Sequence, residues 1–271
     1  MKTYCVIGNP VAHSQSPRIH TLFAEQTGRA VTYTREALDL KTFETDIAEL
    51  FSDGLHGCNV TVPFKERALN VCAHLSERAQ EAQAANTLIR EADGRLRGDN
   101  TDGVGLARDL THNHGVTLSG ARILIAGAGG AARGIVRPLL DASPEAVVIS
   151  NRTPSKADDL ATAFAAAGPV SSLAYDALPA QPFDVLINAT STSLSGAVPP
   201  IPDHCLGADS VLYDLMYAKT PTAYLRWGQD AGASRLIDGI GMLVEQAAES
   251  FYLWEGVRPD TAPVIEALSQ I

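Results

Sequence analysis

The feature that most constrains the fold is a repeated switch between two hydrophobic periods along the chain. Short apolar runs typical of buried strands, such as "YCVIG" and "RILIA", are followed by longer stretches whose apolar residues recur at helical spacing. Strands that alternate with helices favour mainly parallel sheets, because each parallel connection needs a crossover long enough to hold a helix. One stretch differs, since "NTLIREADGRLRGDN" places two short strands around Asp93-Gly94 and predicts a β-hairpin. The pattern therefore predicts an α/β protein.

Length and charge narrow the class of protein further. The 271 residues, 45% of them hydrophobic, suffice for one large or two medium domains with a packed core. A formal net charge of −10 disfavours a nucleic-acid or anionic-membrane partner, which needs a basic surface, but allows an anionic small molecule. The chain shows neither a membrane-spanning apolar run nor the apolar stretch of a signal peptide, so we expect a cytoplasmic protein.

The residue types that most often bind metals are scattered along the chain. The seven histidines show no ligand pattern, and no CxxC pair occurs among the four cysteines, Cys5, Cys58, Cys72 and Cys205. We therefore expect reduced, mostly buried thiols and no metal site.

A glycine-rich turn lies between a strand and a helix in the second half of the chain. It follows the strand "RILIA", opens the next helix and fits the pattern GxGxxG/A with residues Gly127, Ala128, Gly129, Gly130, Ala131 and Ala132. Glycines at these positions let the chain turn tightly and bring backbone N–H groups against a pyrophosphate at the helix N-terminus. A turn without a ligand is the alternative, but the flanking strand and helix favour dinucleotide binding.

The end of the following strand indicates which dinucleotide is bound. A site for NAD usually carries Asp or Glu there to bind the ribose 2′-hydroxyl, whereas this strand ends in Asn151, Arg152 and Thr153, with Lys156 one turn later. Two cations suit a 2′-phosphate, so the sequence predicts NADP(H) as the cofactor. Thr153 before Pro154 also fits an N-cap followed by proline at the first helical position.

Four short polar stretches in the first hundred residues form a second candidate site. Each has a structural explanation: Ser16 fits an N-cap, Thr61 could cap a helix that begins at Pro63 and carries Lys65, and Asn100 or Asp102 could cap the helix after Gly103. Together they offer hydroxyls, carboxamides, one ammonium and carboxylates, which suit a small polyhydroxy acid. The stretches are "HSQSP" (Ser14, Ser16), "NVTVPFK" (Asn59, Thr61, Lys65), "AANTL" (Asn86) and "GDNTDG" (Asp99, Asn100, Asp102).

These motifs in their order resemble the shikimate dehydrogenase family. The resemblance runs from residue 6 to about residue 250 and also includes "GAGGAARG", "NRT", "INATS" and "DGIGMLVEQA". It implies reversible NADPH-dependent reduction of 3-dehydroshikimate to shikimate, in aromatic amino-acid biosynthesis. It also implies that Ser14 and Ser16 bind the substrate carboxylate. Ring hydroxyls would be bound by Thr61, Lys65, Asn86 and Asp102, with Tyr217 and Gln246 closing the site and Asn59 carried to it on the same strand as Thr61.

The resemblance also assigns the cofactor side and the domains. Residues 127 to 131 would hold the pyrophosphate and 151 to 156 the adenosine phosphate, with Leu215 and Gly239 near the nicotinamide and Glu77 close to the cofactor. Because the last helices of the family fold return to the first domain, residues 1–103 plus 239–271 would form the substrate-binding and catalytic domain. Residues 104–238 would form the Rossmann-type NADP-binding domain.

Several alternatives remain open. Lys65 could be the acid/base with Asp102 orienting it, or it could polarise the substrate oxygen while Asp102 relays the proton. The family usually continues "NATS" with Gly and then Met, whereas Thr192, Ser193 and Leu194 stand here, which puts nicotinamide affinity in doubt. Rival functions are a quinate/shikimate dehydrogenase of broader use, whose members tend to carry an acidic residue near Asn151, and a catalytically silent NADP-binding regulatory protein. A monomer and a homodimer are both compatible with the sequence.

Overall fold

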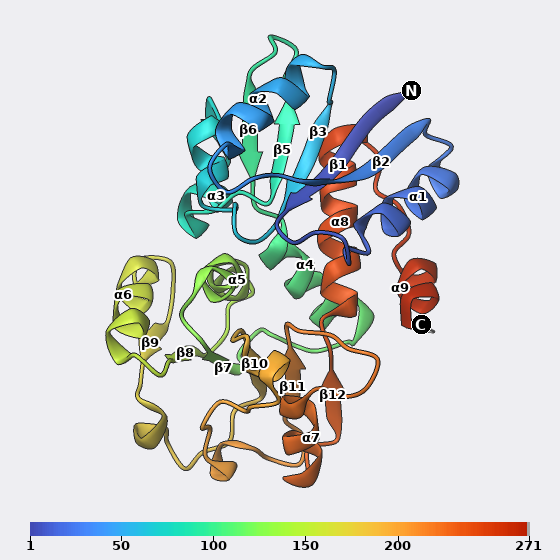
Figure 1. Ribbon diagram of the computed structural model, residues 1–271. Coiled ribbons are helices and arrows are strands. Elements are labelled where there is room, and N and C mark those ends of the chain that lie inside the picture. The colour runs from blue at the N-terminus through green and yellow to red at the C-terminus, as the bar shows by residue number, and fades with distance from the viewer. Residues whose placement is uncertain (270–271) are drawn as a thin grey trace. The chain divides into compact units, whose positions relative to one another are not determined.

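The computed structural model describes residues 1–269, apart from the side chain of Leu194. The chain divides into two compact units (Figure 1), each with its own six-stranded sheet and helices. Unit 1 contains Met1–Gly105 and the segment that begins at Val244, and unit 2 contains Leu106–Leu243. The α/β class predicted from the hydrophobic periods is confirmed. Among the described residues, no helix is both long and apolar enough to cross a membrane.

The sheet of unit 1 has the order β2-β1-β3-β5-β6-β4 and is mixed. β1 pairs in parallel with both β2 and β3, whereas β3, β5 and β6 pair antiparallel, which confirms the predicted hairpin around Asp93-Gly94. Its strands are β1 Lys2–Gly8, β2 Val31–Ala37, β3 Gly57–Val60, β4 His74–Leu75, β5 Thr87–Arg90 and β6 Leu96–Asp99.

Apolar side chains cover both faces of this sheet. Along β1, Cys5 and Ile7 belong to a buried cluster with residues of α2, while Tyr4 and Val6 join a cluster that contains Trp254 of α8. This alternation follows from the two-residue period of a strand and explains why β1 is apolar almost throughout. The α-helices with residues in unit 1 are α1 Ser16–Thr27, α2 Phe43–Ser52, α3 Glu77–Ala82, α4 Asp102–Arg108, α8 Ile240–Glu255 and α9 Ala262–Ser269.

The helix predicted from Pro63 does not form. Pro63 and Lys65 lie in turns, Phe64 between them has no regular structure, and only a short 3-10 helix follows at Arg67–Val71. Phe64 is fully buried and stacks on Phe43, with ring centroids 4.4 Å apart, and the Lys65 carbonyl accepts a hydrogen bond from the Ala85 N–H at 2.9 Å. The prediction was wrong because these contacts with distant residues direct the backbone away from an α-helical path.

The predicted N-cap at Ser16 is also corrected. Ser16 is the first residue of α1, Gln15 takes the N-cap position, and no side chain caps the helix there. The Ser16 hydroxyl instead accepts a hydrogen bond from the Ser14 hydroxyl at 3.1 Å. Both serine hydroxyls are therefore held together at the start of α1, and neither caps the helix.

The sheet of unit 2 is parallel throughout, with the order β12-β11-β10-β7-β8-β9. Chain order reverses between β7 and β10, and in open parallel sheets ligands bind at the carboxyl ends of the strands beside such a reversal. Its strands are β7 Arg122–Ala126, β8 Ala146–Ser150, β9 Val170–Ser172, β10 Val185–Asn188, β11 Val211–Asp214 and β12 Arg235–Ile237, and its helices include α5 Gly130–Asp141, α6 Pro154–Phe164 and α7 Ala223–Asp230.

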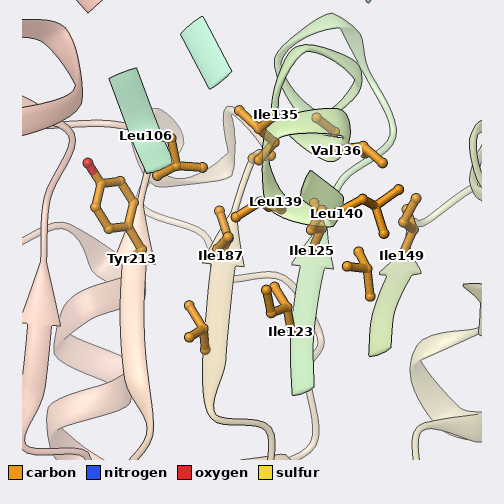
Figure 2. Close-up of a cluster of buried hydrophobic side chains, with 14 of the residues drawn as sticks. Leu106, Ile123, Ile125, Ile135, Val136, Leu139, Leu140, Ile149, Ile187 and Tyr213 are labelled. Atoms are coloured by element: carbon orange, nitrogen blue, oxygen red, sulfur yellow. The ribbon is translucent and has the colours of Figure 1, made fainter. Parts of the chain in front are cut away.

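A buried apolar cluster fixes α5 on this sheet (Figure 2). Ile123 and Ile125 of β7 contribute to the cluster together with Ile135 and Leu139 of α5. The alternate residues of β7 belong to a second cluster that also contains Leu225 of α7. Since both faces of β7 are buried, the glycine turn that follows it starts from a rigid strand end.

Candidate active site

Lys65 and Asp102 form an ion pair in unit 1. The Lys65 Nζ donates to Asp102 Oδ2 at 2.7 Å, and their side chains are 31% and 13% exposed. Asp102 is the first residue of α4, and its backbone N–H donates to Asn100 Oδ1 at 3.1 Å. The pair is partly shielded from water, which strengthens the interaction compared with an exposed pair, yet the ammonium still reaches solvent.

Asn86 holds the other oxygen of this carboxylate. It lies just before β5, and its Nδ2 donates to Asp102 Oδ1 at 2.8 Å. Its Oδ1 accepts from the Thr101 N–H at 2.9 Å. Lys65, Asn86 and Asp102 come from three different segments, and these hydrogen bonds join them within unit 1.

Helix α8 adds Gln246 to this cluster. The Gln246 Oε1 accepts from Asn86 Nδ2 and from the Thr101 hydroxyl, both at 3.3 Å. Asn59 lies deeper, since its Oδ1 accepts from the Tyr33 hydroxyl and its Nδ2 donates to protein oxygens. The direct contact between Asn59 and substrate therefore stays a prediction.

The two serines at the start of α1 are linked to β2. Arg35 donates to the Ser14 carbonyl through Nε at 3.0 Å and Nη2 at 2.7 Å. Thr61 follows β3, and a Cβ placed on Gly8 would approach its Cγ2 to 2.6 Å, so glycine is needed for this close packing. These hydroxyl groups can act as hydrogen-bond donors to a carboxylate or a hydroxyl.

Two further predicted site residues lie in other parts of the chain. Glu77 is exposed at the start of α3. Tyr217 belongs to unit 2 and is 36% exposed, and burial together with the charge of Asp238 raises the pKa of its hydroxyl. Their roles beside cofactor and substrate stay predictions.

The glycine turn of unit 2 presents open backbone at the start of α5. Gly127 has φ 118°, a left-handed conformation that favours glycine, and a Cβ there would meet Ala189 and Thr190 at 3.1 Å. A Cβ on Gly129 or Gly130 would meet nothing within 4 Å. The space beside the first N–H groups of α5 is therefore open, as pyrophosphate binding requires.

The predicted phosphate-binding cations follow β8. Arg152 and Lys156 are exposed, and neither side chain has an ion pair or hydrogen bond to another residue in the described part of the chain. Asn151 shapes the turn, because its Nδ2 donates to the Thr153 carbonyl at 2.9 Å. Thr153 is the N-cap residue of α6, as predicted, but its side chain makes no cap hydrogen bond.

A buried carboxylate organises the far side of the same sheet edge. Asp214 ends β11, is fully buried and accepts hydrogen bonds from Ser193, Thr222 and Asn188 at 2.6, 2.6 and 3.1 Å. Ser193 belongs to the unusual loop noted in the sequence, so this loop is anchored to the end of β11. Sequence reasoning missed Asp214, although its position at a strand end was a usable signal.

Leu215 and Gly239 pack against each other at this edge. A Cβ on Gly239 would lie 2.2 Å from the Leu215 carbonyl oxygen, so only glycine fits. Gly239 directly precedes α8. The two residues assigned to the nicotinamide side thus lie together within unit 2.

Metal-binding groups and disulfides are not found among the described residues. No cluster of three or more His, Cys, Asp or Glu side chains could hold a metal ion there, and all four cysteines are free thiols. Cys5, Cys58 and Cys205 are buried, as the sequence predicted.

Three family models match this chain. The model described as "Shikimate dehydrogenase substrate binding domain" matches residues 6–88. "Shikimate / quinate 5-dehydrogenase" matches residues 109–195, and "Shikimate 5'-dehydrogenase C-terminal domain" matches residues 239–268.

Curated relatives resemble the chain over nearly its whole length. The shikimate dehydrogenase (NADP(+)) of Hahella chejuensis is 52% identical over 270 residues, which cover 100% of this chain and 99% of the relative. The shikimate dehydrogenase (NADP(+)) of Chromohalobacter salexigens is 56% identical over 265 residues, which cover 98% of this chain and 97% of the relative.

Solved structures share the fold. An Ael1 enzyme from Pseudomonas putida is 44% identical, with a TM-score of 0.95 and coverage of 99% and 98% of the two chains. Shikimate 5-dehydrogenase from Thermus thermophilus, solved with NADP(H) and shikimate, is 32% identical, with a TM-score of 0.86 and coverage of 100% and 99%. A 5-ketofructose reductase of Gluconobacter sp. strain CHM43 is 27% identical, with a TM-score of 0.88 and coverage of 99% and 98%.

Proposed function

Because the chain belongs to the shikimate dehydrogenase family, we propose that it catalyses the reversible NADPH-dependent reduction of 3-dehydroshikimate to shikimate. The observation that carries this proposal is the ion pair of Lys65 with Asp102, held by Asn86 among groups that bind a polyhydroxy acid. A cofactor-sensing protein without catalysis would have no need of this arrangement.

NADP(H) supplies the hydride when it is bound. The residues of unit 2 fit this cofactor, because the turn at Gly129 and Gly130 leaves open space beside the N-terminus of α5. Arg152 and Lys156 are exposed and would bind the 2′-phosphate, since neither charge is used by another described residue. Leu215 and Gly239 would border the nicotinamide.

Lys65 is the residue that we assign to proton transfer. Reduction of the ketone generates an alkoxide that needs a proton, and the ammonium has three N–H groups, of which one is directed to Asp102. A further N–H can therefore donate to the substrate oxygen. In the reverse direction the neutral amine would accept the proton from the hydroxyl of shikimate.

Asp102 is better suited to orient Lys65 than to relay the proton. Its Oδ1 accepts from the Asn86 amide, which can only donate at that atom, and its Oδ2 accepts from Lys65. Both oxygens are thus engaged as acceptors in the carboxylate form. In the alternative, Lys65 acts only by its charge and Asp102 takes up and passes on the proton, which would replace these two charge-assisted bonds by weaker ones to a neutral acid.

The remaining side chains would position the substrate. Ser14 and Ser16 would donate to the carboxylate, and Thr61, Asn86 and Gln246 would contact the ring hydroxyls, with Tyr217 completing the site. Asn59 is assigned to the substrate by its place in the polar stretch "NVTVPFK", and Glu77 is assigned to the cofactor by family resemblance alone.

An absorbance assay of NADPH formation from shikimate and NADP⁺ tests the proposal. Quinate and 5-ketofructose are assayed as alternative substrates, the ketose in the reductive direction, and NAD⁺ is assayed as the alternative cofactor. We expect the highest kcat/KM with shikimate and NADP⁺. A higher value with quinate would support the broader dehydrogenase, and NADP⁺ binding without turnover of any substrate would support the regulatory protein.

The proposal also covers the cellular location and the oligomeric state of the protein. We propose a cytoplasmic enzyme, in keeping with the biosynthetic role of the family, and a monomer or homodimer. Cell fractionation would test the location, and light scattering coupled to size-exclusion chromatography would distinguish the monomer from the dimer.

A further inference from the structure

A buried hydrogen-bond network lies behind Asn86, and the proposed mechanism does not use it. Its members are Thr87 and Ser250, both 0% exposed, and Asn59, 7% exposed. They come from β5, α8 and β3, three elements of unit 1. Because polar groups buried this deeply must be hydrogen-bonded, the network restricts how each member can be oriented.

The orientation of the Asn86 amide is fixed by two partners that cannot exchange roles. The Thr101 N–H can only donate, so the atom 2.9 Å from it is the amide oxygen of Asn86. The carboxylate of Asp102 can only accept, so the atom 2.8 Å from its Oδ1 is the amide nitrogen. Rotation of the amide by 180° would leave Asp102 facing an oxygen.

Thr87 favours the same orientation through its hydroxyl. The Thr87 Oγ1 donates to Asn86 Oδ1 at 2.9 Å. It also accepts from Asn59 Nδ2 at 3.2 Å and lies 2.8 Å from Ser250 Oγ. A hydroxyl has a single hydrogen, and the amide oxygen of Asn86 receives it when Ser250 donates across the 2.8 Å contact.

Asn59 is itself held in one orientation. The Asn86 carbonyl can only accept, so the Asn59 atom 3.2 Å from it is Nδ2, which also donates toward Thr87 and Ser250. Asn59 Oδ1 is then left to accept from the Tyr33 hydroxyl at 2.7 Å. The chain of hydrogen bonds therefore runs in one direction, from Tyr33 through Asn59 and Thr87 to Asn86.

We propose that Thr87 is a positioning residue for the reaction. Its hydroxyl holds the Asn86 amide with the nitrogen toward Asp102, and Asp102 in turn directs the ammonium of Lys65. This inference rests on the proposed function, because it assigns a role in the proton transfer of that reaction.

Thr87→Val tests the inference, because it keeps the shape of the side chain and removes the hydroxyl. We expect kcat for shikimate oxidation to fall about tenfold, the effect typical of one lost hydrogen bond next to a reacting group. The dissociation constant of NADP⁺ should change less than about twofold, since the cofactor-binding residues proposed above, apart from the exposed Glu77, lie in unit 2. Thr87→Ser restores the hydroxyl and should recover most of the activity.

Thr261→Val is the matched control. Thr261 is also a buried threonine of unit 1, 6% exposed, and its hydroxyl donates to Glu245 Oε1 at 2.6 Å, outside this network. The Thr261→Val variant should be less stable than the wild type, while its kcat stays within about twofold of the wild-type value. Should Thr87→Val not fold, Thr87→Cys, which offers only a weak S–H donor, carries the same expectation.

The possible outcomes separate the inference from the proposed function. A wild-type protein without activity on shikimate would overturn both. If the wild type is active, three results would overturn the inference alone: an unchanged kcat in Thr87→Val, a kcat in Thr87→Ser as low as in Thr87→Val, or an equal loss of kcat in Thr261→Val. A loss confined to Thr87→Val and rescued by serine supports it.

Discussion

His20 should make the stability of unit 1 depend on pH. Its ring is 0% exposed and stacks on Tyr33, with centroids 4.2 Å apart and planes 4° from parallel. Among the described residues, neither ring nitrogen has a hydrogen-bond partner. Burial lowers the pKa of His20 from 6.5 to about 3, an effect that the nearby Asn59 amide opposes only in part. The folded protein therefore holds this imidazole neutral.

The sign and size of the effect follow from proton linkage. Below pH 6.5 the unfolded chain protonates His20 while the folded protein does not, so acid favours unfolding until the folded pKa near 3 is reached. Each pH unit in that window is worth about 1.4 kcal/mol for one group. Between pH 6.5 and about pH 5, His20 should therefore cost about 2 kcal/mol of unfolding free energy.

His20→Phe removes the titration and keeps an aromatic ring against Tyr33. The two tryptophans of the chain lie one in each unit, and Trp254 is 5.4 Å from the His20 ring, so its fluorescence in a Trp227→Phe background reports on unit 1 alone. Urea unfolding at about pH 7.5 and about pH 5 gives the free energies. From the higher to the lower pH, we expect the unfolding free energy of the parent to fall by about 2 kcal/mol more than that of His20→Phe.

A surface histidine provides the control. His74 is exposed in β4, and His74→Gln serves as the control for removing a histidine outside the core. Equal pH dependence in the parent and in His20→Phe would refute the reasoning, because it would mean that the buried ring is protonated as readily as the ring in the unfolded chain.

Three further predictions concern the proposed catalytic and cofactor-binding residues. Lys65→Met should lower kcat by about 10² to 10⁴ with a smaller effect on KM, and steady-state assays that show a raised KM with kcat intact would contradict the proton-transfer role. Arg152→Ala should weaken NADP⁺ binding far more than NAD⁺ binding in titrations, whereas equal losses would argue against the 2′-phosphate contact. Gly239→Ala should lower the unfolding free energy of unit 2 by about 1 to 3 kcal/mol in urea, because its Cβ would collide with the Leu215 carbonyl. Gly129→Ala should leave stability unchanged and weaken NADP⁺ binding, because a Cβ there meets nothing within 4 Å. The opposite ranking of the two variants in stability would refute the packing argument.

Local signals in the sequence determined the class of fold and the framework of both candidate sites. The change of hydrophobic period predicted β7, α5 and β8. The glycine turn could be predicted because its conformation depends on its own residues and their immediate neighbours. The cations after β8 were likewise identified from their position at a strand end. Family resemblance then named the substrate and the remaining site residues, including Gln246.

Tertiary structure decided what depends on residues far apart in the chain. Lys65 was expected on a helix, but the stacking of Phe64 on Phe43 and the bond from Ala85 to the Lys65 carbonyl place it in a turn. The role that we propose for Thr87, which directly follows the predicted Asn86, depends on the contacts of its hydroxyl with Asn59 and Ser250. Helical and strand periods are properties of a short stretch, whereas strand order and buried polar partners follow from how whole elements pack, which no short stretch encodes.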